Sequence, residues 1–153
     1  MNETGLFFQM EPDTTLATWQ LAGKKKNKER LLVALCCNSD GSHKIKVLVI
    51  GWSAKPHCFK NINLTNLGVM YWYNKKAWMM AVLFQKWLHY FDGQMHGQKV
   101  LFLFDNAPSH IVTGVRLNNT TVKFLLPNTT LRLQPCDVGI IASFKAHYRR
   151  KFV

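Results

Sequence analysis

The sequence predicts an α/β protein with a mixed sheet flanked by helices, and three observations support this fold class. Short apolar runs bounded by turn-forming residues indicate strands, and two longer segments carry apolar residues at helical spacing. These elements follow one another as three strands, a helix, two strands and a helix, an order that favours a layered α/β architecture. The chain has 153 residues, of which 48% are hydrophobic, so we expect one domain with a single core.

The first half of the chain predicts three strands. Residues 5–10 form the end of a strand whose first part we expect to be truncated. Residues 31–37 are continuously apolar and predict a buried strand, and the turn residues 38–42 connect it to an antiparallel strand at 44–51. Residues 52–73 contain scattered proline, asparagine and glycine and predict a long loop with one short extended piece.

The second half predicts helices at 75–91, 111–117 and 137–152 and strands at 100–104 and 121–126. Asn74 is the expected N-cap of the first helix. An apolar stripe on that helix predicts core packing, and its members are Trp78, Met79, Val82, Leu83, the stem of Lys86, Trp87 and Tyr90. The last helix has an apolar face, formed by Ile140, Ile141, Phe144 and Tyr148, and a basic face, formed by Lys145, Arg149, Arg150 and Lys151.

Two carboxylates stand at the ends of core elements. Asp105 directly follows the apolar strand 100–104, and Asp137 begins the last helix. With eight acidic residues in the whole chain, this placement indicates ligands for Mg²⁺ or Mn²⁺. The alternatives are an Asx-turn at Asp105 and a helix N-cap at Asp137. His110 and Asn106 follow Asp105 closely, and we expect them to shape the site; the alternative for His110 is a bond to the backbone that closes the turn.

The net charge of +12 predicts attraction to a polyanion such as DNA, although a basic fold without a nucleic-acid role is the alternative. The basic residues expected to contact DNA are Lys24, Lys25, Lys26, Lys28, Arg30, Lys145, Arg149 and Arg150. The run from Lys24 to Arg30 is also compatible with a solvated loop or a nuclear-import signal. We expect a soluble, intracellular protein with reduced, buried cysteines, no membrane contact and no small-molecule substrate.

A series of short motifs resembles the DDE superfamily endonuclease domain of pogo and Tigger transposases, a group that includes centromere protein B and the jerky-like proteins. The matching stretches run in family order along the chain and are residues 3–7, 28–31, 38–44, 60–62, 74–79, 105–110, 127–130, 134–137 and 141–150. Each is short, but the combination is specific. The resemblance implies an RNase H-like fold in which three acidic residues hold two divalent ions for DNA strand nicking and transfer.

The family's second and third aspartates fall on Asp105 and Asp137, and the first falls on Asn2. A neutral amide removes a full negative charge from between two cations and cannot bridge them. Glu3 is the nearest substitute, but we expect it to project away from the site because successive strand residues face opposite sides. Cys136 and Val138, on either side of Asp137, also depart from the family pattern, which has leucine and glutamine there.

The resemblance therefore implies a single DDE-type domain over residues 1–153 that lacks the upstream helix-turn-helix DNA-binding region. It further implies DNA as the partner, the nucleus as the location and Mg²⁺ or Mn²⁺ as the cofactor. Two functions stay open: a metal-dependent DNA endonuclease and strand transferase, and a transposon-derived module that binds nucleic acid or a partner without catalysis. Asn2 favours the non-catalytic module as the present function, whereas Asp105 and Asp137 indicate descent from a metal-dependent endonuclease.

Overall fold

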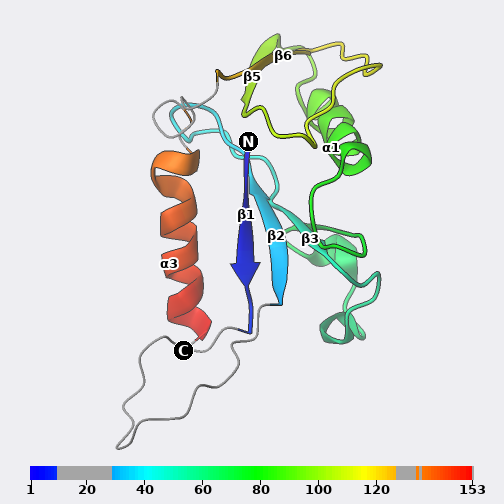
Figure 1. Ribbon diagram of the computed structural model, residues 1–153, viewed down its shortest axis with the longest axis vertical. Coiled ribbons are helices and arrows are strands. Elements are labelled where there is room, and N and C mark those ends of the chain that lie inside the picture. The colour runs from blue at the N-terminus through cyan, green and yellow to red at the C-terminus, as the bar shows by residue number, and fades with distance from the viewer. Residues whose placement is uncertain (10–28, 127–133, 135, 153) are drawn as a thin grey trace, which may run out of the picture.

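The computed structural model describes residues 1–9, 29–126, 134 and 136–152, which form a mixed α/β structure (Figure 1). The strands are β1 (Asn2–Phe7), β2 (Arg30–Leu35), β3 (Leu48–Gly51), β4 (Met70–Tyr73), β5 (Val100–Phe104) and β6 (Thr120–Phe124). The helices are α1 (Ala81–Gln94) and α3 (Ile141–Phe152), with a π-helical turn at Cys136–Ile140 and 3-10 turns at His57–Phe59 and Leu64–Asn66. None of the described helices is long and apolar enough to cross a membrane.

The strands form two sheets. Four of them lie in the order β1-β2-β3-β4, in which β1, β2 and β3 are antiparallel neighbours and β4 joins β3 in parallel. A separate parallel pair is made by β5 and β6. The expectation of a mixed sheet with helices is confirmed. Within the described residues, β1 is an edge strand of the larger sheet.

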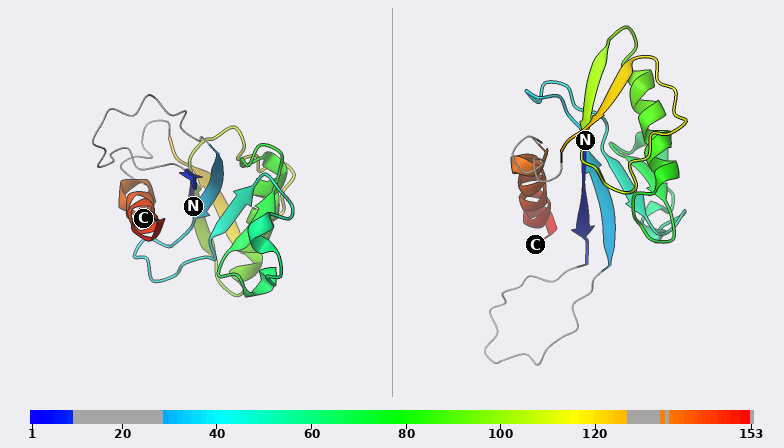
Figure 2. Two further views of the ribbon diagram at one scale, coloured as in Figure 1. Left: turned by 90° about the horizontal axis from the view of Figure 1, so that it is seen from below. Right: turned by 45° about the horizontal axis from the view of Figure 1, so that its top comes forward.

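Helices cover both faces of the larger sheet (Figure 2). Alternate residues of β2 explain this arrangement: Leu32 and Ala34 belong to the core shared with α1, whereas Val33 and Leu35 pack with the residues of α3. The α3 residues in that second cluster include Ile141, Phe144 and Tyr148, as the apolar face predicted. A strand covered on both faces needs a continuous apolar run, which the β2 sequence supplies.

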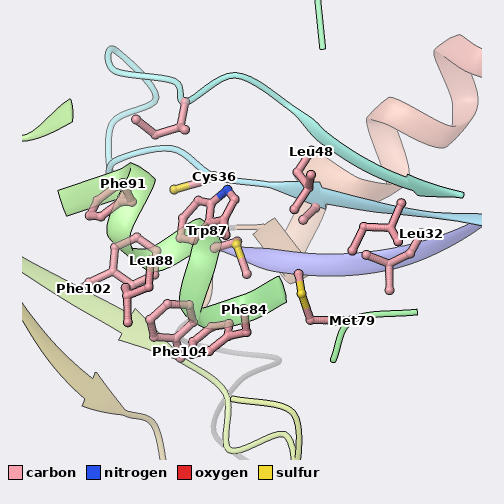
Figure 3. Packing of buried hydrophobic residues seen from close by; sticks show 14 of the residues in the cluster. Leu32, Cys36, Leu48, Met79, Phe84, Trp87, Leu88, Phe91, Phe102 and Phe104 are labelled. Atoms are coloured by element: carbon pink, nitrogen blue, oxygen red, sulfur yellow. The ribbon is translucent and has the colours of Figure 1, made fainter. Parts of the chain in front are cut away.

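The main core is rich in aromatic rings (Figure 3). The residues that α1 buries are spaced as one helical stripe and are Phe84, Trp87, Leu88 and Phe91. They pack on β5, where the ring centroids of Phe91 and Phe102 are 4.4 Å apart and those of Phe84 and Phe104 are 4.9 Å apart. These contacts attach the β5–β6 pair to the helix, so β5 ends at a fixed position.

The predicted boundaries of the first helix were wrong. The helix begins at Ala81, with Met80 at the N-cap position, and Asn74 instead organises a turn that precedes it. The predicted stripe was therefore displaced: Trp78 is 43% exposed and Val82 is 73% exposed. The turn occupies the residues before Ala81. The apolar stripe that packs into the core is therefore made of later residues of α1.

Three further expectations need correction. The short helix predicted at 111–117 is absent, and these residues form turns between β5 and β6. The predicted loop 52–73 ends in a full strand, β4, which pairs with β3 over four residues. Cys36 and Cys136 are buried and reduced as expected, but Cys58 is exposed, because it lies in the 3-10 turn outside the core.

Candidate functional site

Asn2 and Asp105 lie at one cavity of about 550 Å³ beside the first residues of β1. Asn2 begins β1 and is 9% exposed, and its side-chain oxygen accepts a hydrogen bond from the backbone N–H of Glu3 at 2.7 Å. Asp105 directly follows β5. The packing of β5 on α1 brings these two residues together although they are far apart in sequence.

His110 is the buried partner of Asp105. The turn that follows β5 closes through a hydrogen bond from the His110 backbone N–H to the carbonyl of Ala107, at 2.9 Å. This turn places the imidazole Nδ1 2.8 Å from Asp105 Oδ1 and 3.2 Å from its backbone oxygen. The ring stacks on Phe84 with centroids 4.5 Å apart. Asn106 is exposed and is not among the residues that line the cavity.

The other ring nitrogen of His110 binds Glu3, because its Nε2 lies 2.8 Å from Glu3 Oε1. The expectation that Glu3 projects away from the site was therefore wrong. Glu3 pairs with Ala34, which faces α1, so strand alternation does separate it from Asn2. The α1 side is, however, the side on which His110 and Asp105 lie. An acidic residue next to Asn2 and a histidine after Asp105 were the available sequence signals for this pair.

The contacts between His110 and its two carboxylate partners shift the pKa of His110 and of Asp105. Burial by itself lowers the pKa of His110, but hydrogen bonds to Asp105 and Glu3 outweigh it and raise the pKa to about 9. The hydrogen bond from His110 likewise lowers the pKa of Asp105 below its ordinary value of 3.8. At neutral pH a protonated imidazole thus donates to both carboxylates, and it ties β1 to the end of β5.

The segment before α3 lies close to Asn2. Gln134 Nε2 donates to the backbone oxygen of Met1 at 2.6 Å, and Cys136 Sγ donates to the backbone oxygen of Leu35 at 3.7 Å. Leu35 is the strand partner of Asn2. Asp137 follows Cys136 directly in the π-helical turn Cys136–Ile140. The segment that leads into α3 is thus attached to the start of β1 and to its neighbour β2.

The predicted DNA-contacting residues divide into two sets. Lys24, Lys25, Lys26 and Lys28 lie outside the described residues. Arg30 begins β2 and is exposed; on α3, Arg149 and Arg150 are exposed and Lys145 is half-buried. Because α3 packs on the sheet through its apolar face, its basic residues are left for solvent or a polyanion.

The side chains that the structure describes at this cavity do not form a site for two divalent ions. Asn2 contributes only a neutral amide, and one oxygen of Asp105 already binds His110. Among the side chains that the structure describes, no three from histidine, cysteine, aspartate and glutamate are grouped so that they could hold a metal ion. Two closely spaced cations repel each other strongly, so they need carboxylates between them.

The chain belongs to the DDE superfamily endonuclease family, whose model matches residues 28–153. Among its relatives, it is 35% identical to "ARS-binding protein 1" of Schizosaccharomyces pombe over 100% of this chain and 31% of that protein. It is also 35% identical to "CENP-B homolog protein 2" of the same yeast, over 98% of this chain and 31% of that protein.

The mouse "Tigger transposable element-derived protein 4" is 34% identical over 97% of this chain and 29% of its own length. The chain thus spans about a third of the length of these relatives. No solved structure gives a significant match. The resemblance to Tigger and centromere protein B relatives that the sequence motifs suggested is confirmed.

Proposed function

We propose that this chain is a transposase-derived DNA-binding domain whose site no longer supports efficient metal-dependent strand cleavage. The observation that carries the proposal is Asn2: it lies at the same cavity as Asp105, where the family resemblance implies an aspartate. Replacing that carboxylate by an amide removes one negative charge from the expected set of three. We expect the remaining carboxylates, which include Glu3 and Asp105 at this cavity, to hold two divalent ions less tightly than the full set of three aspartates.

Binding of DNA is supported by three observations. The net charge is +12, the last turn of α3 carries Arg149, Arg150 and Lys151, and one relative is named "ARS-binding protein 1". Contacts of this kind are mainly to phosphates, so we expect little sequence preference from the chain alone. The proposal also includes an RNase H-like fold, a single endonuclease-like domain over residues 1–153 and a nuclear location.

Two matched pairs of substitutions test the DNA interface. Arg149→Ala with Arg150→Ala removes two charges from α3, and Lys55→Ala with Lys60→Ala removes two exposed charges from another surface. Each phosphate contact contributes about 0.9 to the slope of log K against log salt concentration. Anisotropy titrations of a labelled duplex should therefore show the slope reduced by about 2 in the α3 variant only. Absence of duplex binding by the unmodified chain at low salt would refute the proposal.

The second candidate function is a metal-dependent DNA endonuclease, which Asp105 and Asp137 favour. The discriminating experiment compares the unmodified chain, Asn2→Asp, and Asn2→Asp combined with Asp105→Ala on a transposon-end duplex with Mn²⁺. We expect little nicking by the first and more Mn²⁺ binding by the second, measured by the paramagnetic resonance of free Mn²⁺. Robust nicking by the unmodified chain, absent from the variant that carries Asp105→Ala, would instead favour the endonuclease as the function.

A further inference from the structure

Trp78 is an exposed aromatic residue held in a rigid turn between β4 and α1. The side chain of Asn74 accepts hydrogen bonds from the backbone N–H groups of Lys76 and Trp78, at 2.9 and 3.3 Å, and donates to the Trp78 carbonyl at 2.5 Å. Ala77, buried at 4%, has a φ of 46°. A non-glycine residue in this left-handed region is strained and persists only where its surroundings fix it. The turn therefore presents the indole, which is 43% exposed, in one place.

A cation lies over this indole. The Arg30 guanidinium carbon is 4.4 Å from the centroid of the Trp78 ring, within the range of a cation–π contact. Both residues are exposed, so the pair is open to a ligand. The neighbouring Lys75 and Lys76 are exposed as well. An indole with a guanidinium over its ring, and with two exposed lysines close to it in sequence, suits a planar group that carries a negative charge.

The indole and the candidate site share one cavity. The 550 Å³ cavity that contains Asn2 and Asp105 continues along residues 2–5 of β1 to residues 78–81, so Trp78 and Asp105 both line it. Its volume is within the roughly 300–1,000 Å³ of pockets that take one small ligand. A single nucleotide fits a cavity of this volume. A base pair inside a duplex is stacked between its neighbours, so its flat face cannot contact the cavity wall.

We propose that this cavity binds one unpaired nucleotide, with its base stacked on Trp78 and its phosphate near Arg30 and the two lysines. The inference rests on the proposed DNA-binding function and adds a subsite to it. Stacking on an aromatic ring is tolerant of base identity, because every base has a π-face. The chain therefore prefers DNA with an unpaired end over blunt duplex, without reading its sequence.

The experiment measures anisotropy titrations of a blunt duplex and of the same duplex with a three-nucleotide single-stranded tail. We expect the unmodified chain to bind the tailed DNA at least about fivefold more tightly, which corresponds to about 1 kcal/mol. Trp78→Ala should abolish this preference, and Trp78→Phe should restore most of it. Trp52→Ala is the matched control, since Trp52 is 60% exposed and does not line this cavity.

A second measurement does not depend on any variant. A 2-aminopurine base in the tail should lose fluorescence when the unmodified chain binds, whereas the same base inside the duplex should not. Equal affinity for the two DNAs, equal effects of Trp78→Ala and Trp52→Ala, or an unquenched tail would each overturn the subsite while duplex binding stands. Failure to bind either DNA would instead overturn the proposed function on which the subsite rests.

Discussion

Replacing His110 by glutamine should make the stability of the chain less dependent on pH. The pKa of His110 is raised from an ordinary 6.5 to about 9 in the folded chain. One pKa unit corresponds to 1.36 kcal/mol, so the bridge to Glu3 and Asp105 contributes about 3 kcal/mol to the free energy of unfolding. The folded state binds the proton more tightly. This contribution is therefore fully present below pH 6.5 and is lost as the pH rises through about 9.

The assay is urea unfolding followed by tryptophan fluorescence at pH 6, 7.5 and 9.5, with a chelator present. We expect His110→Gln to be less stable by up to about 3 kcal/mol at pH 6 and by much less at pH 9.5. His89→Gln, an exposed position on α1, is the control. Burial raises the pKa of Cys36 to about 11, and this alkaline titration cancels because all three proteins retain Cys36.

A stability difference between the unmodified chain and His110→Gln that is constant from pH 6 to 9.5 would refute the reasoning. A difference that grows with pH would refute it as well. Either result would mean that the imidazole is neutral in the folded chain, or that its two carboxylate partners are replaced by water. Phe84, which stacks on the ring, would then account for any loss of stability through packing alone.

Other substitutions test the packing that positions the site. Asp92 is buried and accepts two backbone N–H groups from the turn before β6, so we expect Asp92→Asn to lower thermal stability by about 1–3 kcal/mol at pH 7. Although burial raises the pKa of Asp92, these donors lower it overall, so the loss should shrink only as the pH falls below 3.8. Gly51→Ala would push a methyl group into the Tyr71 ring and should cost about 1–3 kcal/mol in a thermal melt. Gly93→Ala, in an open part of α1, should instead stabilise by about 0.5–1 kcal/mol; equal melting shifts would contradict the packing.

The sequence predicted the strands better than the turns. Continuous apolar runs located β2 and β5. In β2 the run has a physical reason, because this strand is covered on both faces and so has no polar alternation. The start of α1 was missed, since Asn74 has the chemistry of a helix cap but serves a separate turn. The short strand β4 lies where the sequence predicted one short extended piece, but its pairing was not predicted, because a strand of four residues depends on its neighbour β3.

For the site, the sequence placed Asp105 and Asp137 at the ends of elements and identified Asn2 as a departure from the family. It could not show that Glu3 and Asp105 share one histidine. That contact joins residues 107 positions apart in sequence, and it depends on which face of β1 looks toward α1.

The sequence by itself thus determined the family, the fold class and the positive charge, because these follow from local motifs, apolar periodicity and composition. Only the tertiary structure decided that His110 is held between two carboxylates and that Trp78 opens into the cavity of Asp105. The physical reason is that both features arise where β1, the end of β5 and the turn before α1 meet. Their meeting is fixed by the packing of α1 on both sheets, and no local sequence pattern records it.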